Sequence, residues 1–490
     1  MYASGKDQSE HIAQTHCLHF VVVPNACNQM GIGPARLMAD SDVDLLAGAG
    51  GLLMDDAQSD HNGRKALLLV RNNEDCSEFV ALAHTMGIHI VERIDQRGKS
   101  DSKWFMGRGK LQDIVEDLRS SSEGHPWNGV DLLLLHTNAT PRQLVGVNDA
   151  VGVEVWDRVR LLLALFTAHA SSVEARTQVR IARLQSDRTV LREIVKLQTT
   201  GERAGYGGAG QTAAGSILTN VNRELTALRK RQRKQVKSAT ERRRQRKQHA
   251  MTIGLAGYTN AGKSSLFRRL SGKEVLVEDR LFSTLESTLG RLESSPRILL
   301  ADTIGFIDGL PNATLEAFRA TLAEAIECDL LLLLIDLSDN ITEMERKIRT
   351  SIRELTERAL DADDTSIMER MQPVLTKADA VVSKSLDAVQ PMLSEYGLSN
   401  PLVVSSHTGE GLDELKSMIL NTLLGPKKTL VILDGQSQEM ASKAILSRIY
   451  DAVYVHEHIE LPNGIEVQIS ATDETISMLS ANHDGRIQLK

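Results

Sequence analysis

The sequence predicts a multidomain α/β protein, and three observations support this fold class. The 490 residues exceed what a single hydrophobic core usually organises, so about three domains are expected. Short apolar runs alternate with helical patterns along the chain, as in parallel sheets covered by helices. A glycine-rich turn that fits a phosphate-binding loop lies between one such strand and the next helix, at residues 257–264.

The composition narrows the class of protein. Hydrophobic residues make up 41% and charged residues 25%, as in ordinary globular proteins. The four cysteines are well separated and form no C-x-x-C pair, which argues against a zinc site and a disulfide framework and favours a reducing compartment. The longest apolar runs have six residues, against the ~20 that a membrane span needs. We expect a cytoplasmic monomer without a membrane span, and peripheral association with a membrane stays open.

The first part of the chain is predicted to contain an extension and a small parallel α/β domain. Residues 1–63 carry eight acidic and two basic residues, and we assign this extension no function and expect part of it to be disordered. In residues 64–166, a basic turn at Trp104–Ile114 precedes a helix and could either meet phosphate or remain solvated. The expected strands are Ala66–Val70, Ile88–Ile94, Val130–His136 and Val153–Asp157, with helices near Glu74–Met86 and Leu111–Leu118.

Residues 167–250 are predicted to form a helical hairpin with a basic arm. Val173–Gln198 has helical spacing, and Gly201–Gly215 reads as a glycine-rich loop before a second helix. Between Val221 and Ala250 there are twelve Lys or Arg and two acidic residues, although the whole chain has a net charge of −7. Such a block indicates a polyanion partner, and we favour RNA over DNA or a merely solvated helix face.

A phosphate-binding loop opens the domain expected at residues 251–426. GYTNAGKS matches G-x-x-x-x-G-K-[ST], in which backbone N–H groups and a lysine hold phosphates and a hydroxyl holds Mg²⁺. Apolar residues before the loop and helical spacing after it supply the required strand and helix. The residues expected to bind nucleotide here are Gly257, Tyr258, Thr259, Asn260, Ala261, Gly262, Lys263, Ser264 and Ser265.

Further motifs follow in the order that a nucleotide switch requires. The polar segment Arg280–Thr288 offers Thr284 and Thr288 to Mg²⁺, which Ser264 would also bind. An apolar strand then ends in Asp302, which can hold a magnesium-bound water. Gly305 follows in the turn, where its N–H can contact a γ-phosphate.

The base-binding residues are expected at the ends of two later strands. Thr376, Lys377 and Asp379 follow one of them, and the carboxylate of Asp379 can accept hydrogen bonds from two N–H groups of guanine. Adenine has no such pair of donors, so the motif predicts GTP rather than ATP. Ser405, Ser406 and His407 follow the next strand and are expected to back the base.

These motifs resemble the HflX family of ribosome-associated GTPases. The likeness covers about residues 65–424 and rests on LFSTLES, DTIGFIDGLPNATLEAFRATLAEA and DLLLLLIDLSD. It implies that residues 64–250 bind ribosomal RNA of the large subunit, that the GTP-bound protein separates ribosomal subunits, and that Thr284 is the magnesium ligand. This chain departs from the family in having Thr376 for asparagine, Ser406 for alanine, and GYGGAGQTAAG in place of a GPGE-like string.

The sequence also predicts slow hydrolysis of GTP by the isolated protein. Lys263, Thr284 and Gly305 are the expected catalytic groups, but Phe306 stands where many small GTPases have a glutamine that orients water. A phenyl ring cannot supply that hydrogen bond, so we expect stimulation by the ribosome. Two alternatives remain: a non-catalytic GTP-bound RNA scaffold or ribosome assembly factor, and an ATP-dependent enzyme, which Asp379 disfavours.

The last segment, residues 427–490, reads as a small α/β appendage without an identifiable site. Apolar runs at Leu430–Leu433 and Ile465–Ser470 predict strands, and Ala441–Tyr450 predicts a helix.

Overall fold

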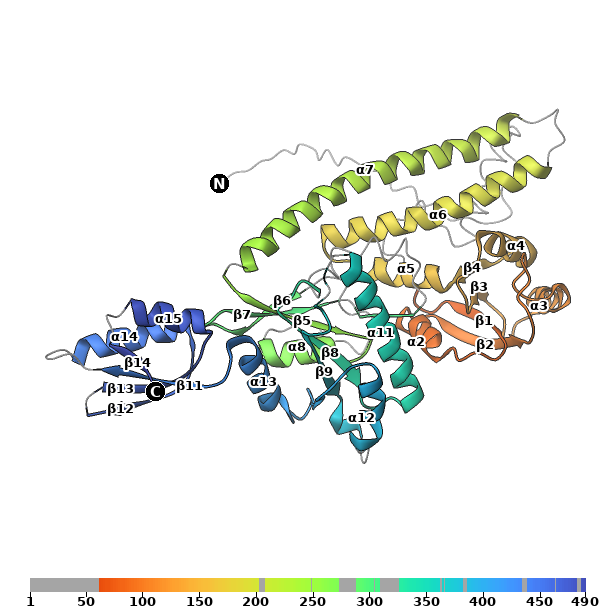
Figure 1. Cartoon of the computed structure of the whole chain (residues 1–490). Helices are drawn as coiled ribbons and strands as arrows, with labels where there is room; N and C mark the ends of the chain where they lie inside the picture. The colour runs from red at the N-terminus through yellow and green to blue at the C-terminus, as the bar shows by residue number, and fades with distance from the viewer. Residues whose placement is uncertain are drawn as a thin grey trace, which may run out of the picture.

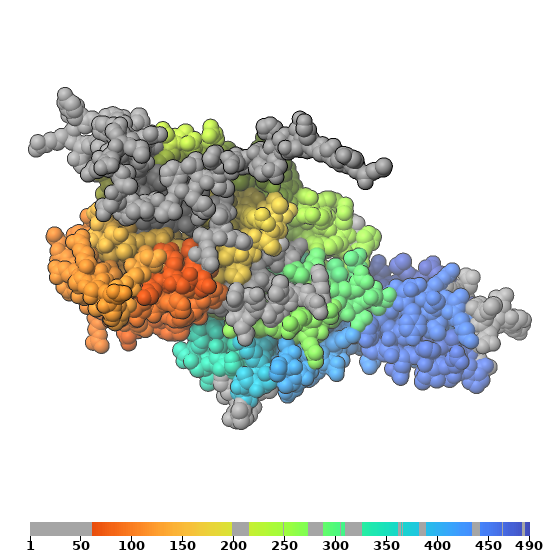
Figure 2. Space-filling view, turned by 180° about the vertical axis from the view of Figure 1, so that it is seen from behind, coloured from red at the N-terminus to blue at the C-terminus, as the bar shows by residue number. Residues whose placement is uncertain are grey.

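A computed structural model describes residues 61–201, 208–247, 249–272, 288–303, 305–308, 326–361, 364, 366–381, 386–433, 439–462, 464–482 and 486–490. These residues form three sheets and a long helical hairpin (Figure 1). The N-terminal and C-terminal parts of the chain lie at opposite ends of the molecule (Figures 1 and 2). The largest sheet lies between their sheets (Figure 1). The predicted α/β multidomain fold class is confirmed.

The N-terminal sheet has four parallel strands in the order β2 (His89–Gln96), β1 (Lys65–Arg71), β3 (Val130–Leu135) and β4 (Glu154–Asp157). Successive residues of β1 point to opposite faces of the sheet. Leu68 packs with α2 (Ser77–Thr85) and α5 (Arg158–His169), whereas Leu69 packs with α3 (Arg108–Ser120) and α4 (Pro141–Val151). The four expected strands are therefore confirmed, and the two inner strands, β1 and β3, are buried on both faces over most of their length, whereas the edge strand β2 is largely exposed.

Two helices of this part were not anticipated. α4 lies in a stretch that the sequence analysis left without an element, although Thr140 and Gln143 form a capping box around Pro141 at its start. α5 is buried along most of its length, so its sequence lacks the amphipathic period that identifies a surface helix.

The hairpin consists of α6 (Val173–Gly201) and α7 (Gly208–Lys247). Ile181, Leu184 and Leu191 of α6 are buried in the same core as α4, and Val221 and Leu225 of α7 join that core. The expected loop at Gly201–Gly215 was too long, because α7 already begins at Gly208. Helix α7 then leads within four residues into the next strand, so the hairpin is joined directly to the central sheet.

The central sheet has the order β10 (Leu402–Val403), β9 (Met371–Thr376), β8 (Leu330–Asp336), β5 (Met251–Gly257), β7 (Ile298–Asp302) and β6 (Thr288–Glu293). Only β6 is antiparallel to its neighbour. One face packs on α11 (Ile341–Asp361) and α12 (Leu386–Glu395), and the other on α8 (Lys263–Ser271) and α13 (Leu412–Leu424). Because all of β8 is buried, its run of leucines and isoleucine shows no alternation.

The C-terminal sheet is antiparallel, with the order β12 (Tyr454–Leu461), β13 (Gly464–Ser470), β11 (Lys428–Leu433) and β14 (Ile487–Leu489). Helices α14 (Glu439–Ala452) and α15 (Asp473–Ala481) share its core. The predicted strands at β11 and β13 and the helix at α14 are confirmed, whereas β12, β14 and α15 were not anticipated.

The N-terminal and central parts share one hydrophobic core. It extends from Phe79 of α2 through Leu162 of α5 to Tyr258, Phe306 and Met344 of the central part. The edge of the central sheet where its strands end therefore lies next to the N-terminal part.

Candidate nucleotide-binding site

The residues expected to bind nucleotide gather at the carboxyl ends of four strands of the central sheet, and Asp336 joins them from a fifth strand. Gly257 ends β5, Asp302 ends β7 and Thr376 ends β9, while Asp336 ends β8 and Ser405 follows β10. Because these parallel strands run in one direction, their following loops meet at one edge of the sheet, where α/β proteins bind ligands. Thr284 lies outside the described residues.

The loop after β5 has the backbone shape that a phosphate cradle needs. Gly257, Asn260 and Gly262 all have positive φ, at 147°, 62° and 81°. A Cβ at Gly257 would lie 2.5 Å from the carbonyl oxygen of Leu334 in β8, so this position requires glycine. Gly262 caps α8, and the first-turn N–H groups of this helix face the loop as an anion site does.

Lys263 is buried at the first position of α8. Its Nζ donates hydrogen bonds to the carbonyl oxygens of Tyr258 at 2.8 Å and Gly257 at 3.3 Å. Burial lowers the pKa of Lys263 to about 8, although the negative charge of Asp302 acts in the opposite direction. A phosphate at the loop would replace neutral acceptors with anionic ones, which favours the charged amine.

Ser264 and Asp302 form a hard oxygen site. The Oγ of Ser264 donates to Oδ2 of Asp302 at 2.7 Å, and Asp302 is fully buried. Hydroxyl and carboxylate oxygens, completed by water and phosphate oxygens, are the donors that Mg²⁺ prefers. The residues present therefore fit the expected cation. Thr288, the other threonine weighed for this role, begins β6 opposite Asp302.

Gly305 and Phe306 lie directly against the phosphate loop. The N–H of Phe306 donates to Gly257 O at 3.0 Å, and its carbonyl accepts from Thr259 N at 2.8 Å. A Cβ at Gly305 would lie 2.9 Å from Thr259 Cα and 2.7 Å from Lys263 Nζ. The Phe306 ring is buried in the core, so it cannot orient a water at the site.

Thr376 links the base motif to the phosphate loop. Its Oγ1 lies 2.9 Å from Ala261 O and 3.1 Å from Ile335 O, and the side chain is 2% exposed. The hydroxyl therefore reaches the loop from the position where the resembled family usually has asparagine. Lys377 follows with a φ of 58° and pairs with Oδ2 of Asp336 at 2.6 Å.

Asp379 and Ser405 meet across the ends of β9 and β10. Ser405 Oγ donates to Oδ1 of Asp379 at 2.5 Å and accepts from the N–H groups of His407 and Thr408. The hydrogen bond from Ser405 holds the pKa of Asp379 below its usual range, so the exposed carboxylate stays ionised. Ser406 is half-buried and His407 is exposed beside this pair.

Asp336 is a residue of the site to which the sequence motifs gave no role. It orients Lys377, and its position at the end of a buried strand beside the base motif was a usable signal. Tyr258 was expected among the nucleotide-binding residues of the loop, but its side chain points away from the loop and donates to Glu78 of α2. No local pattern could reveal a contact between residues 180 positions apart.

Comparisons with known proteins agree with this geometry. Residues 252–363 match the family described as 50S ribosome-binding GTPase, and residues 73–167 match the N-terminal region described as GTP-binding GTPase N-terminal. GTPase HflX of Methanocaldococcus jannaschii is 30% identical over 403 residues, which cover 81% of this chain and 93% of that protein.

A second relative shows the same likeness in sequence. GTPase HflX of Thermofilum pendens is 30% identical, with 86% of this chain and 97% of that protein covered. A crystal structure of a GTP-binding protein from Sulfolobus solfataricus in complex with GDP has a TM-score of 0.42 and 22% identity, and the match covers 73% of this chain and 98% of that one. Identity and coverage of the curated relatives show that the chain belongs to the HflX family of GTPases, which bind and hydrolyse GTP with Mg²⁺ as cofactor.

Proposed function

We propose that this GTPase is a switch that binds the large ribosomal subunit and acts in the splitting, rescue or recycling of ribosomes. The observation that carries the proposal is the direct connection between the basic helix α7 and β5, the strand that ends in the phosphate loop. The matched family description, 50S ribosome-binding GTPase, supports the same partner. A change at the nucleotide thus lies close to the proposed RNA-binding surface.

The end of α7 is anchored to the GTPase part. Arg243 is 8% exposed and its Nη1 lies 3.3 Å from Oε1 of Glu327, whereas Arg242 and Arg244 on either side are exposed. The basic arm therefore has two kinds of arginine. Those facing solvent suit phosphate contacts, and Arg243 holds the helix in place.

A second basic feature lies between the two helices of the hairpin. A cavity of about 640 Å³ is bordered by four arginines and one glutamate, and Arg180 pairs with this glutamate at 2.9 Å. The surplus of positive charge favours an RNA backbone over a neutral partner. The charged residues of the cavity are Arg176, Arg180, Arg183, Glu224 and Arg231.

For the nucleotide site we propose the following roles. The loop from Gly257 to Ser265 and Lys263 hold the phosphates, Ser264, Thr284 and Asp302 belong to the cation site, and Asp379 selects guanine. Bound Mg²⁺ neutralises charge on the phosphate oxygens during transfer to water. Lys377, Thr376, Ser405, Ser406 and His407 shape the base pocket.

Hydrolysis by the isolated chain is proposed to be slow. Lys263 offers positive charge and Gly305 a backbone N–H, but the buried ring of Phe306 positions no water. The ribosome would provide the missing positioning of the attacking water, either by ordering the segment around Thr284 or by supplying a group that binds this water. We also propose a cytoplasmic monomer, with the five segments 1–63, 64–166, 167–250, 251–426 and 427–490 as its domains.

Co-sedimentation with purified large subunits tests the proposed partner. We expect stronger binding with GTP or a non-hydrolysable analogue than with GDP. Replacement of Arg242, Arg244 and Arg246 by alanine, with Arg243 kept, should weaken binding and lower the salt slope by about 2 to 3. Removal of Lys427, Lys443 and Arg448 from the C-terminal part changes the net charge equally and serves as the control.

The results separate this proposal from its alternatives. Equal binding by both triple variants would refute the role of the basic arm. Binding without hydrolysis in a single turnover would favour a GTP-bound scaffold. Preference for an assembly intermediate over mature large subunits would favour an assembly factor.

A further inference from the structure

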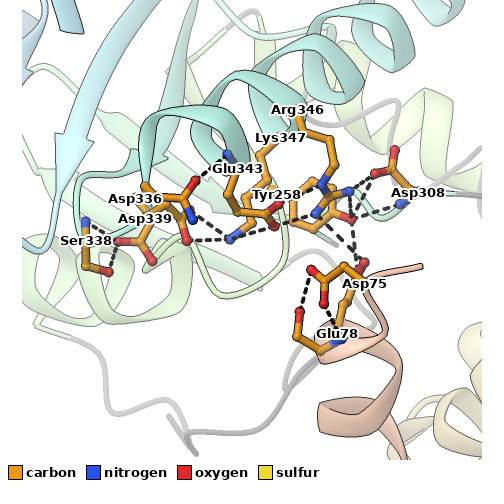
Figure 3. A network of polar contacts seen from close by, with 12 residues as sticks. Asp75, Glu78, Tyr258, Asp308, Asp336, Ser338, Asp339, Glu343, Arg346 and Lys347 are labelled. Carbon is orange, nitrogen blue, oxygen red and sulfur yellow. Dashed lines mark hydrogen bonds and ion pairs between the residues drawn. The ribbon is translucent and has the colours of Figure 1, made fainter. Parts of the chain in front are cut away.

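Tyr258, the second residue of the phosphate loop, ties this loop to the N-terminal part of the chain. Its side chain is 3% exposed and points into the seam between α2 and α11 (Figure 3). The hydroxyl donates to Oε1 of Glu78 at 2.9 Å and accepts from Asp308 N and Arg346 Nη1, both at 3.1 Å. One donor and two acceptor positions are all that a phenol offers, so the hydroxyl is saturated.

The same contacts hold Asp308, three residues after Gly305. Its N–H donates to the Tyr258 hydroxyl, and its carbonyl oxygen accepts from Arg158 Nε at 3.1 Å. Its carboxylate pairs with Arg346 (Figure 3). The same carboxylate accepts a hydrogen bond from the hydroxyl of Thr350. Every polar group of Asp308 is thus fixed by a side chain from another element.

The N-terminal part contributes to these contacts of Tyr258 and Asp308 through Glu78 and Arg158. The two residues pair with each other at 2.9 Å, one from α2 and the other from the first position of α5. Glu78 then contacts Tyr258, and Arg158 contacts Asp308. Burial and the adjacent Glu78 raise the pKa of the Tyr258 hydroxyl, which therefore remains a donor to Glu78.

In this arrangement the segment that contains Gly305 lies directly against the phosphate loop. A Cβ at Gly305 would lie 2.9 Å from Thr259 Cα, so the backbone of Gly305 already contacts the phosphate loop. The backbone bonds between Phe306 and the loop close the same gap. The contacts of Asp308 with Tyr258, Arg158 and Arg346 oppose any movement of this segment away from the loop.

We propose that Glu78 is a positioning residue that holds the segment 305–308, through Tyr258 and Asp308, away from its γ-phosphate contact. The inference rests on the proposed role of Gly305. Because coupling between two sites is reciprocal, the binding of GTP also loosens the contact between Glu78 and Tyr258. The position of the N-terminal part thereby sets the preference of the site for GTP over GDP.

The test compares affinities for GDP and for a non-hydrolysable GTP analogue in the full-length chain. Glu78→Ala should raise the affinity for the analogue on the order of tenfold and leave the affinity for GDP unchanged. Tyr258→Phe, which removes only the hydroxyl, should shift the ratio of the two affinities in the same direction. Glu116→Gln on α3, an exposed site of the same part, is the matched control.

A merely structural role would give a different pattern. General loosening of the site would lower the affinities for both nucleotides. An unchanged ratio of the two affinities in Glu78→Ala and in Tyr258→Phe would overturn the proposal. In the double variant the shift should not exceed that of the larger single variant, whereas additive shifts would also overturn it. Gly305→Ala, whose Cβ would meet Thr259, displaces the same segment and leaves Glu78 and Tyr258 intact. An unchanged affinity ratio in this variant as well would mean that Gly305 makes no γ-phosphate contact, whereas a changed ratio in this variant alone would mean that Glu78 is not coupled to the segment.

Discussion

Replacement of Asp379 by asparagine tests the guanine specificity of the site. The carboxylate is exposed and stays ionised because Ser405, itself fully buried, donates to Oδ1 at 2.5 Å. The other oxygen remains for the N–H groups of guanine. A hydrogen bond to a charged group contributes about 1.5–3 kcal/mol. Two such bonds give about 3–6 kcal/mol, and we take the lower end because the site is open to solvent.

We therefore expect Asp379→Asn to weaken GTP binding by about two orders of magnitude. Xanthosine triphosphate carries a carbonyl where guanosine has its amino group, so the new amide should bind it better than the wild-type carboxylate does. Equilibrium titration with both nucleotides measures the exchange of preference, and Asp451→Asn in the C-terminal part is the control. An unchanged ratio of the affinities for GTP and xanthosine triphosphate would refute the proposal that Asp379 binds the base.

The remaining predictions concern the phosphate end of the site. The low pKa of Lys263 implies that binding takes up a proton once the pH exceeds about 8, because bound phosphate restores the charged amine. Calorimetry of GDP binding in buffers of different ionisation enthalpy should show more proton uptake at about pH 9 than at about pH 7.5, and Lys263→Arg should remove the difference. Ser264→Ala should raise the Mg²⁺ concentration for half-maximal GTPase activity by about tenfold or more, since Oγ would be one of few protein ligands; an unchanged requirement would remove Ser264 from the cation site. Gly305→Ala should lower kcat by about tenfold or more, because its Cβ would meet Thr259 and displace the segment; a wild-type rate would show that the segment tolerates this displacement.

The sequence predicted which candidate residues lie together where a strand end alone positions a residue. Strand β8 is a continuous apolar run, so its first and last residues could be predicted. Its end also indicated the edge of the sheet at which the loops after the neighbouring parallel strands lie. Gly257, Asp302 and Asp379 follow such strands and meet at the edge of the sheet for that reason. Helix α5 escaped prediction because it is buried on most sides and has no polar face.

Contacts between distant parts could not be predicted from periodicity. The hydrogen bond between Glu78 and Tyr258 depends on how the N-terminal and central parts pack together, and neither residue has a local pattern that identifies its partner. Arg243 likewise looked equivalent to its neighbours in a basic run, yet it is buried against Glu327. In both cases the tertiary packing, and not the residue type, determines the role.

GTP turnover by the full-length protein, alone and with purified large ribosomal subunits, tests the proposed ribosomal control of hydrolysis. We predict slow turnover by the protein alone, because Phe306 cannot orient water, and stimulation by about tenfold or more with large subunits. Small subunits at the same concentration should stimulate much less. Fast turnover by the isolated protein that large subunits leave unchanged would contradict the proposal that a ribosomal partner controls this switch.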